Sequence, residues 1–107
     1  MGTCTERATA ANGAIAKTLK TDRPFQLTEV RLHLSGVGGA TNFTATVDAN
    51  AGTAYDLLLF KEDMTLVTDL VWQPDEPLHF CTGDEIDFAF ANGNNRAYGI
   101  EIKYNPL

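Results

Sequence analysis

Hydrophobic and polar residues alternate one by one along much of this chain, which is the pattern of strands that bury a single face. The clearest stretch is 98–104, where Tyr98, Ile100, Ile102 and Tyr104 fall on one face and polar or small residues on the other. The same alternation predicts strands within 29–34, 43–48 and 86–91. Shorter apolar segments predict further strands around 15–19, 66–72 and 78–80.

Turn-forming residues interrupt the chain between these segments. Gly, Pro, Asn and Asp gather at 21–24, 35–39, 50–52, 62–65, 73–77, 82–84 and 92–95, and they supply the backbone angles that tight turns need. Short strands at even spacing are typical of a β-sandwich or barrel. We therefore predict an all-β fold of about eight short antiparallel strands in a two-sheet sandwich, of jelly-roll type.

The segment 53–64 allows two interpretations. Thr53 and Asp56 have the spacing of a helix capping box, with Tyr55 and two leucines along one helix face. The alternative is a strand buried on both faces, over Leu57 to Phe60. We favour the strand, because all neighbouring segments are predicted strands and turns bound this one closely.

The first twelve residues differ from the rest of the chain. They are rich in Thr and Ala and show no apolar periodicity. We predict a flexible N-terminal arm over residues 1–12, ordered only if a partner holds it, and a β-sandwich domain over residues 13–107.

Composition excludes several classes of function. The chain has 107 residues, room for one domain, with a net charge of −6 and eight basic residues scattered singly. Nucleic-acid binding needs clustered Lys and Arg and is not expected. The longest apolar runs are far shorter than the ~20 residues of a membrane span, so no membrane partner is expected either.

No catalytic constellation emerges. His33 and His79 are the only imidazoles and Ser35 is the only serine, so no nucleophile stands beside a base that a third group could orient. His33 lies on the polar face of its strand, where a solvated histidine is expected. Spacing alone leaves open a pair of carboxylates for glycoside cleavage, but a chain this short has little material for a cleft. We expect a protein that is not an enzyme and holds no cofactor.

Metal sites are weakly supported. His79 and Cys81 share a strand face, but zinc needs further ligands, which only His33 or Cys4 could add. Cys4 and Cys81 are expected to be free thiols, because they could pair only if the arm folded back.

Acidic residues near turns suggest calcium only faintly. Asp48, Asn50 and Gly52 resemble the start of a calcium loop, but Leu59 stands where the closing glutamate belongs. A turn explains them better. The acidic residues around 84–87 and 75–76 are interpreted as solvated charges at strand entries and in a loop.

Surface aromatics and threonines suggest binding to other molecules. Trp72, Tyr55, Tyr98 and Tyr104 could form a sugar-stacking platform, although each also falls at a core-phase position of its strand. For a protein interface, the candidate residues are those of the arm and of one threonine-rich strand face: Thr3, Cys4, Thr5, Arg7, Thr44 and Thr46.

Several segments resemble small structural proteins of tailed bacteriophages. They are Arg23–Pro24–Phe25 with residues 29–34, then 54–60 with Asp63–Met64, 83–90 and 98–102. The resemblance spans roughly residues 13–105 and rests on strand and turn signatures rather than on chemical motifs. It implies a virion component assembled in the host cytoplasm, such as a cement or decoration protein, and proteins of that kind are often jelly rolls and often trimers.

We therefore expect a non-catalytic capsid cement protein that packs between subunits of the major capsid protein and forms a homo-oligomer, with a trimer favoured. A head–tail or tail accessory protein is one alternative. A carbohydrate-binding module or receptor-binding tip of sandwich type is the other.

Overall fold

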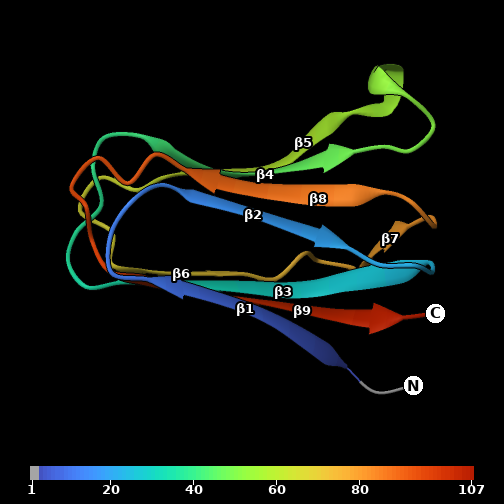
Figure 1. Cartoon of the computed structure of the whole chain (residues 1–107), viewed down its shortest axis with the longest axis horizontal. Coiled ribbons are helices and arrows are strands. Elements are labelled where there is room, and N and C mark those ends of the chain that lie inside the picture. Colours follow the sequence, from blue (N-terminus) through green and yellow to red (C-terminus); the bar gives the residue numbers. More distant parts are fainter. Residues whose placement is uncertain (1–2) are drawn as a thin grey trace.

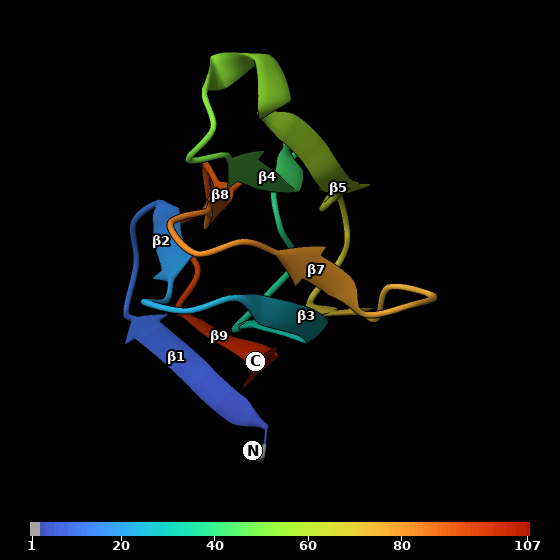
Figure 2. The ribbon, with the colours of Figure 1, turned by 90° about the vertical axis from the view of Figure 1, so that its right-hand side faces the viewer.

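Two antiparallel sheets face each other across an apolar core in the computed structural model, which describes residues 3–107 (Figures 1 and 2). Sheet A contains β1 (Cys4–Ala10), β9 (Tyr98–Pro106), β3 (Phe25–Leu34) and β6 (Asp69–Trp72) in that order, and β7 (Leu78–Phe80) also pairs with β3. Sheet B contains β2 (Ile15–Lys20), β8 (Glu85–Phe90), β4 (Asn42–Asp48) and β5 (Leu57–Asp63). The predicted all-β sandwich is confirmed.

Most links between consecutive strands cross from one sheet to the other. Only β4–β5 and β6–β7 stay within a sheet. The jelly-roll description stays a prediction, with which this strand order is compatible. The helical content of the described residues is one turn of 3-10 helix, Thr53–Tyr55, and no helix there is long and apolar enough to cross a membrane.

The prediction of a flexible N-terminal arm is wrong for residues 4–10. They form β1, which pairs with β9 from Cys4 opposite Tyr104 to Ala10 opposite Tyr98. Backbone hydrogen bonds do not require apolar side chains, so the long edge of β9 can order a strand whose residues are mostly small and polar. The Thr9 hydroxyl adds a hydrogen bond to the Tyr98 carbonyl. Met1 and Gly2, at the start of the predicted arm, lie outside the described residues.

The core consists of the inward faces predicted by the alternation. Phe25, Leu27, Leu32 and Ile100 come from sheet A and face residues of sheet B across the sandwich. From sheet B, Ile86, Phe43, Phe88 and Phe90 are 0–2 % exposed. Aromatic rings connect neighbouring strands, since Phe43 stacks on Phe88 with centroids 6.3 Å apart.

The segment 53–64 combines both interpretations of its sequence. Its first turn is helical and the strand β5 follows. The expectation that this strand is buried on both faces is wrong, because Leu57 and Leu58 are 62 % and 50 % exposed. β5 is the edge of sheet B, and the β4–β5 hairpin projects beyond the rest of the sandwich (Figure 1).

A β-bulge in β3 shapes the outer face of sheet A. The register with β9 shifts between Leu27 and Glu29, which leaves Thr28 as an extra residue. The Thr28 hydroxyl donates to the Lys103 carbonyl at 3.0 Å. Bulges bend a strand and redirect its side chains, and the residues around this one form a polar cluster described below.

Hydrogen exchange tests whether β1 is part of the sandwich. Backbone amides of residues 4–10 that point toward β9 are expected to exchange more slowly than unstructured amides, because the ladder must open first. Exchange at unstructured rates throughout residues 4–10 would contradict the pairing. The outward-pointing amides of the same strand serve as the internal control.

Truncation of Phe88 tests the core. Phe88→Ala is expected to lower the free energy of unfolding by about 3–5 kcal/mol, because a buried aromatic side chain leaves both a transfer loss and a cavity. Leu66→Ala, at a position 79 % exposed, should change stability by less than about 0.5 kcal/mol. Urea denaturation measures both, and equal effects of the two changes would contradict the core assignment.

Candidate interaction surfaces

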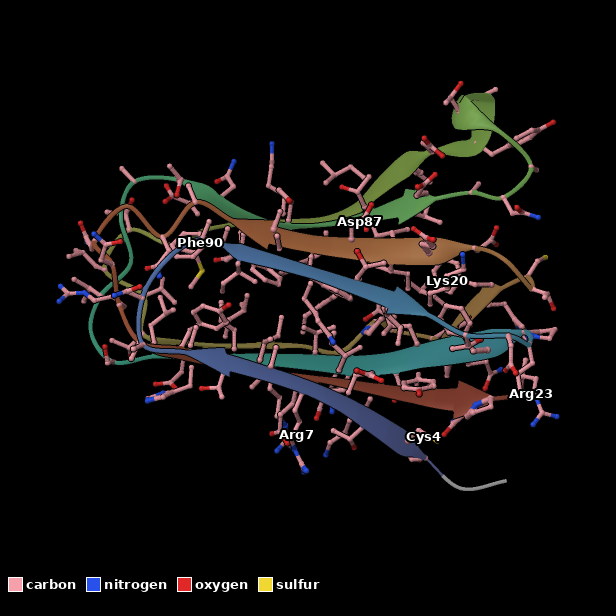
Figure 3. The ribbon with its side chains drawn as sticks, in the orientation of Figure 1. Cys4, Arg7, Lys20, Arg23, Asp87 and Phe90 are labelled. Atoms are coloured by element: carbon pink, nitrogen blue, oxygen red, sulfur yellow. The ribbon has the colours of Figure 1, made fainter. Side chains whose placement is uncertain are left out.

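The predicted interface residues fall on opposite sides of the sandwich. Thr3, Thr5 and Arg7 lie on the outer face of sheet A, and Figure 3 shows Arg7 pointing away from the sandwich. Cys4 is half-buried and contacts the Tyr104 hydroxyl, whose pKa is raised by burial first and by nearby Cys4 and Glu6 next. Thr44 and Thr46 are half-buried on sheet B, far from the others in the fold. The structure thus separates them into two surfaces.

The outer face of sheet A carries two rows of side chains across its four main strands. One row runs Arg7, Glu101, Arg31, Val71 from β1 to β6. The next row runs Thr9, Gly99, His33, Asp69. Because Gly99 has no side chain, the second row is interrupted in the middle of the sheet.

A hollow of about 570 Å³ lies over these rows, and Gly99 is among its lining residues. Arg7 and Thr9 line it from β1, Arg31 and His33 from β3, and Val71 from β6. Most of the exposed lining is carbon, with charged groups among it. This volume lies within the range of ~300–1,000 Å³ that ligand pockets occupy.

The cations on this face extend further into solvent than their carboxylate partners. The Arg7 side chain is 72 % exposed, and its Nε lies 2.7 Å from Oε2 of Glu101, which is 33 % exposed. Arg31 is 49 % exposed and lies 2.6 Å from Glu29, which is 9 % exposed. Arg7 is therefore the most exposed charged side chain of these ion pairs, while Asp69, 63 % exposed, presents a carboxylate on the same face.

Glu29 is the most deeply buried charge of the face. The Gln73 amide donates to its Oε1 at 2.6 Å, and Lys103 lies 3.5 Å from its Oε2. The hydrogen bond from Gln73, with the charges of Arg31 and Lys103, holds the pKa of Glu29 below its ordinary value against the opposing effect of burial. A hollow of about 420 Å³ beside it is lined by Thr3, Thr5, Thr28, Glu29, Gln73 and Lys103.

His33 forms a hydrogen-bonded pair with Asp69 at the rim of the larger hollow. Nδ1 of His33 lies 2.5 Å from Oδ1 of Asp69, and both side chains are more than half exposed. The hydrogen bond from His33 is the main cause of a lowered Asp69 pKa, with the Thr68 hydroxyl adding to it. His33 is thus solvent-exposed, as the sequence predicted, but it is paired.

The projecting hairpin is the main apolar surface of the described residues. Tyr55, Leu57 and Leu58 are 66 %, 62 % and 50 % exposed and lie close together in sequence around the start of β5. Tyr55 and Leu57 line a groove of about 420 Å³ together with Val47 and Phe80. Leu58 pairs with Thr46 and does not line the groove, because successive residues of a strand face opposite sides of the sheet. Exposed apolar side chains that lie together, as Tyr55 and Leu57 do, are typical of protein interaction sites.

Carboxylates gather on the same part of sheet B. Asp56, Glu85 and Asp87 raise the pKa of Asp48 through charge repulsion, with Asp56 contributing most, and Lys20 opposes them. Figure 3 shows Asp87 and Lys20 on neighbouring strands of this sheet. The base of the hairpin is therefore acidic, whereas the outer face of sheet A carries paired charges of both signs.

The residues considered as metal ligands or as a disulfide pair do not come together in the described structure. Within residues 3–107, no group of three or more His, Cys, Asp or Glu side chains is placed to hold a metal ion. His79 and Cys81 are exposed, and Cys4 and Cys81 are free thiols. Asp84, near the faint calcium-loop pattern, accepts hydrogen bonds from the Asn50 and Cys81 amides, which makes it a turn-stabilising residue.

The aromatic residues do not form a common surface. Trp72 stacks on Phe60 with centroids 4.6 Å apart, and Trp72, Tyr98 and Tyr104 pack against the core. Tyr55 alone among the four proposed platform residues is mostly exposed. The core interpretation of the other three therefore fits the structure, as their strand phase indicated.

Sequence reasoning missed Gly99 and the exposure of the hairpin. Gly99 was assigned to the polar face of its strand, and a glycine inside a strand was the available signal of an open site. For Leu57 and Leu58 the apolar run gave no signal, because the same run fits a buried strand or an exposed edge.

Comparison with known proteins supports the fold alone. No family model matches the chain, and no curated protein matches it. The chain is similar in structure to the Drosophila NLP core, a protein described in terms of pentamer formation and histone binding. The TM-score is 0.55 at 8 % sequence identity, covering 98 % of this chain and 99 % of that one.

The pH dependence of stability tests the acidic cluster. Because the folded pKa of Asp48 lies above its ordinary value of 3.8, the folded state binds this proton more tightly than the unfolded state does. Ionised Asp48 therefore destabilises the fold at pH values above its raised pKa, and the loss disappears as pH falls through that pKa to below 3.8. Asp48→Asn should raise the melting temperature at pH 7 and leave it unchanged at pH 3.

The control for this prediction is Asp75→Asn, in the loop between β6 and β7, away from the cluster. Salt should shrink the gain at pH 7, because it screens exposed charges. A gain that persists at pH 3 would contradict an electrostatic origin.

Proposed function

We propose that this protein is a non-catalytic structural component of a bacteriophage virion, a capsid cement protein that stabilises the shell by packing between subunits of the major capsid protein. The resemblance of its strand and turn segments to small phage structural proteins supports the proposal. In this proposal the chain is made in the host cytoplasm and becomes part of the virion.

The exposed apolar hairpin is the observation that carries the proposal. Monomeric proteins rarely expose several large apolar side chains close together unless they form an interaction site. Tyr55, Leu57 and Leu58 lie close together in sequence and are at least half exposed. They also lie at β5, an edge of sheet B, whose outer backbone groups are available for pairing. A surface of this kind favours a protein partner over a soluble substrate.

The proposed assembly is a homo-oligomer. The resemblance favours three copies, and the pentamer described for the NLP core makes five the alternative. In a ring of either size, each copy contacts its neighbours through two different surface patches, and the remaining surface is left for the capsid.

A head–tail or tail accessory protein is the nearest alternative, since it would use the same kind of apolar contact. The carbohydrate-binding alternative rested on an aromatic platform, but Trp72 stacks inside on Phe60 instead. Tyr55 remains the exposed aromatic of that set, and one ring is a weak sugar platform.

Capsid binding tests the proposal. Purified particles analysed by quantitative mass spectrometry should contain the protein at a copy number comparable to that of the major capsid protein. Leu58→Asp should weaken its binding to empty capsids at least tenfold, because an apolar contact near the interface centre is lost. Leu66→Asp, at another exposed leucine, is the matched control.

Two outcomes separate the alternatives. A copy number of only a few per particle would favour an accessory position at the head–tail junction or tail. It would contradict a role as a capsid cement protein. Absence from the particle would overturn a virion role altogether.

A further inference from the structure

The dipeptide Asn-Gly occurs twice in this chain, at Asn12–Gly13 and at Asn92–Gly93. The first pair lies between β1 and β2, and the second lies between β8 and β9. In an Asn-Gly dipeptide the backbone nitrogen of the glycine can attack the asparagine side chain with little hindrance, because glycine has no Cβ and bends freely. The two dipeptides share this chemistry but differ in how the fold holds the asparagine.

Asn92 is buried, and its side-chain amide is hydrogen-bonded at both ends. It is 1 % exposed. Its Nδ2 donates to the Gly13 carbonyl at 2.7 Å and to the Arg96 carbonyl at 2.9 Å, and its Oδ1 accepts from the Arg96 backbone amide at 3.0 Å. The side chain can turn toward Gly93 only after these hydrogen bonds break. Together they should slow its reaction about 100-fold, since one typical hydrogen bond changes an equilibrium roughly fivefold.

Asn12 lies in open surroundings. It is exposed, and within residues 3–107 its side chain forms no hydrogen bond or ion pair. Gly13 has a left-handed φ of 88°, which glycine adopts without strain, and a Cβ built on it would meet no atom within 4 Å. The Asn12 side chain is therefore free to move, and water reaches the dipeptide.

We propose that Asn12 is a site of spontaneous deamidation, at which the folded chain converts its own asparagine to aspartate and isoaspartate, while Asn92 is protected. The backbone nitrogen of Gly13 gives its proton to solvent and bonds to Cγ of Asn12. The side-chain nitrogen takes a proton from solvent and leaves as ammonia. The five-membered imide ring closes readily, because both reacting groups are held on adjacent residues.

Water then opens this ring in one of two ways. Hydrolysis of the bond between Cγ of residue 12 and the Gly13 nitrogen gives aspartate. Hydrolysis of the bond between the backbone carbonyl carbon of residue 12 and the same nitrogen gives isoaspartate, in which the chain runs through the former side chain. Water is the only co-reactant, so the chemistry proceeds whether or not the protein is a capsid component.

The site lies in the link that attaches β1 to the sandwich. Residues 11–14 cross from sheet A to sheet B at one end of the molecule (Figure 1), and Asn92 anchors the Gly13 carbonyl there. Within the described residues, β1 has no other covalent connection to the sandwich, and its inward side chains are only half-buried. Isoaspartate adds one atom to the backbone of this link, and both products add a negative charge. The modification should therefore loosen the pairing of β1 with β9.

Peptide mapping by mass spectrometry tests the proposal on the purified, folded protein. During storage at pH 8, Asn12 should be converted while Asn92 in the same sample stays intact, with initial rates that differ about 100-fold. In water labelled with heavy oxygen, the product at residue 12 should carry the label. No conversion at Asn12, or equal rates at the two sites, would overturn the proposal.

Unfolding separates the effect of the fold from that of the sequence. In concentrated urea both dipeptides are unprotected, so the rates at Asn12 and Asn92 should become similar. If Asn92 stays intact in urea as well, the hydrogen bonds of the fold are not what protects it, and that part of the proposal is wrong.

A substitution at the site gives the matched comparison. Asn12→Gln keeps an exposed amide but would have to close a larger ring, so conversion at residue 12 should stop without a change in melting temperature. Asn42→Gln, at an exposed asparagine that no glycine follows, should leave the rate at Asn12 unchanged. Conversion that continues in Asn12→Gln, or that slows equally in Asn42→Gln, would contradict the assignment.

Hydrogen exchange then tests the effect on β1. After storage, the backbone amides of residues 4–10 that pair with β9 should exchange faster in the unaltered protein and at the original rate in Asn12→Gln. Unchanged exchange in a fully converted sample would show that the modification leaves β1 in place, and would overturn the proposed loosening.

Discussion

The packing of two inward-facing rows of aromatic and aliphatic side chains is the interaction on which the structure depends. A chain this small buries its apolar surface in a single layer between two sheets, with Phe25 and Phe80 stacked on one side and Phe43 and Phe88 on the other. Once that layer is filled, every alternate residue must face outward. The core packing therefore determines which residues lie on the outer faces. Those residues are the ones that can contact other molecules.

Strand lengths and sheet edges determine where exposed apolar and charged side chains lie on the outer faces. The β4–β5 hairpin rises away from the sandwich on the side of sheet B (Figure 1), so Tyr55 and Leu57 near its tip stay exposed. In sheet A, the bulge at Thr28 changes the side-chain phase of β3 and places Glu29 under Gln73, Arg31 and Lys103. Glu29 is thereby drawn in, whereas Arg31 stays half exposed. The face as a whole exposes charges of both signs, with Arg7 72 % and Asp69 63 % exposed.

The two surfaces also differ in how they relate to stability. Charge repulsion around Asp48 lowers the free energy of unfolding at neutral pH. The exposed side chains of Leu57 and Leu58 add little to it, because they stay in contact with water. Gly99 similarly weakens the strand that it interrupts. Features that reduce the stability of a monomer are often associated with binding.

The sequence by itself determined the class of fold, because side-chain alternation has a period of two only in strands and the turns between them have a recognisable composition. Segments 29–34, 43–48, 86–91 and 98–104 all became strands with the predicted faces inward. Tertiary structure alone decided that residues 4–10 are a strand, because backbone pairing with β9 orders them without any apolar pattern. It also decided that Leu57 and Leu58 are exposed and that Gly99 opens a hollow. Edge position, hairpin overhang and the neighbours across a sheet are set by contacts between distant segments, which no local pattern records.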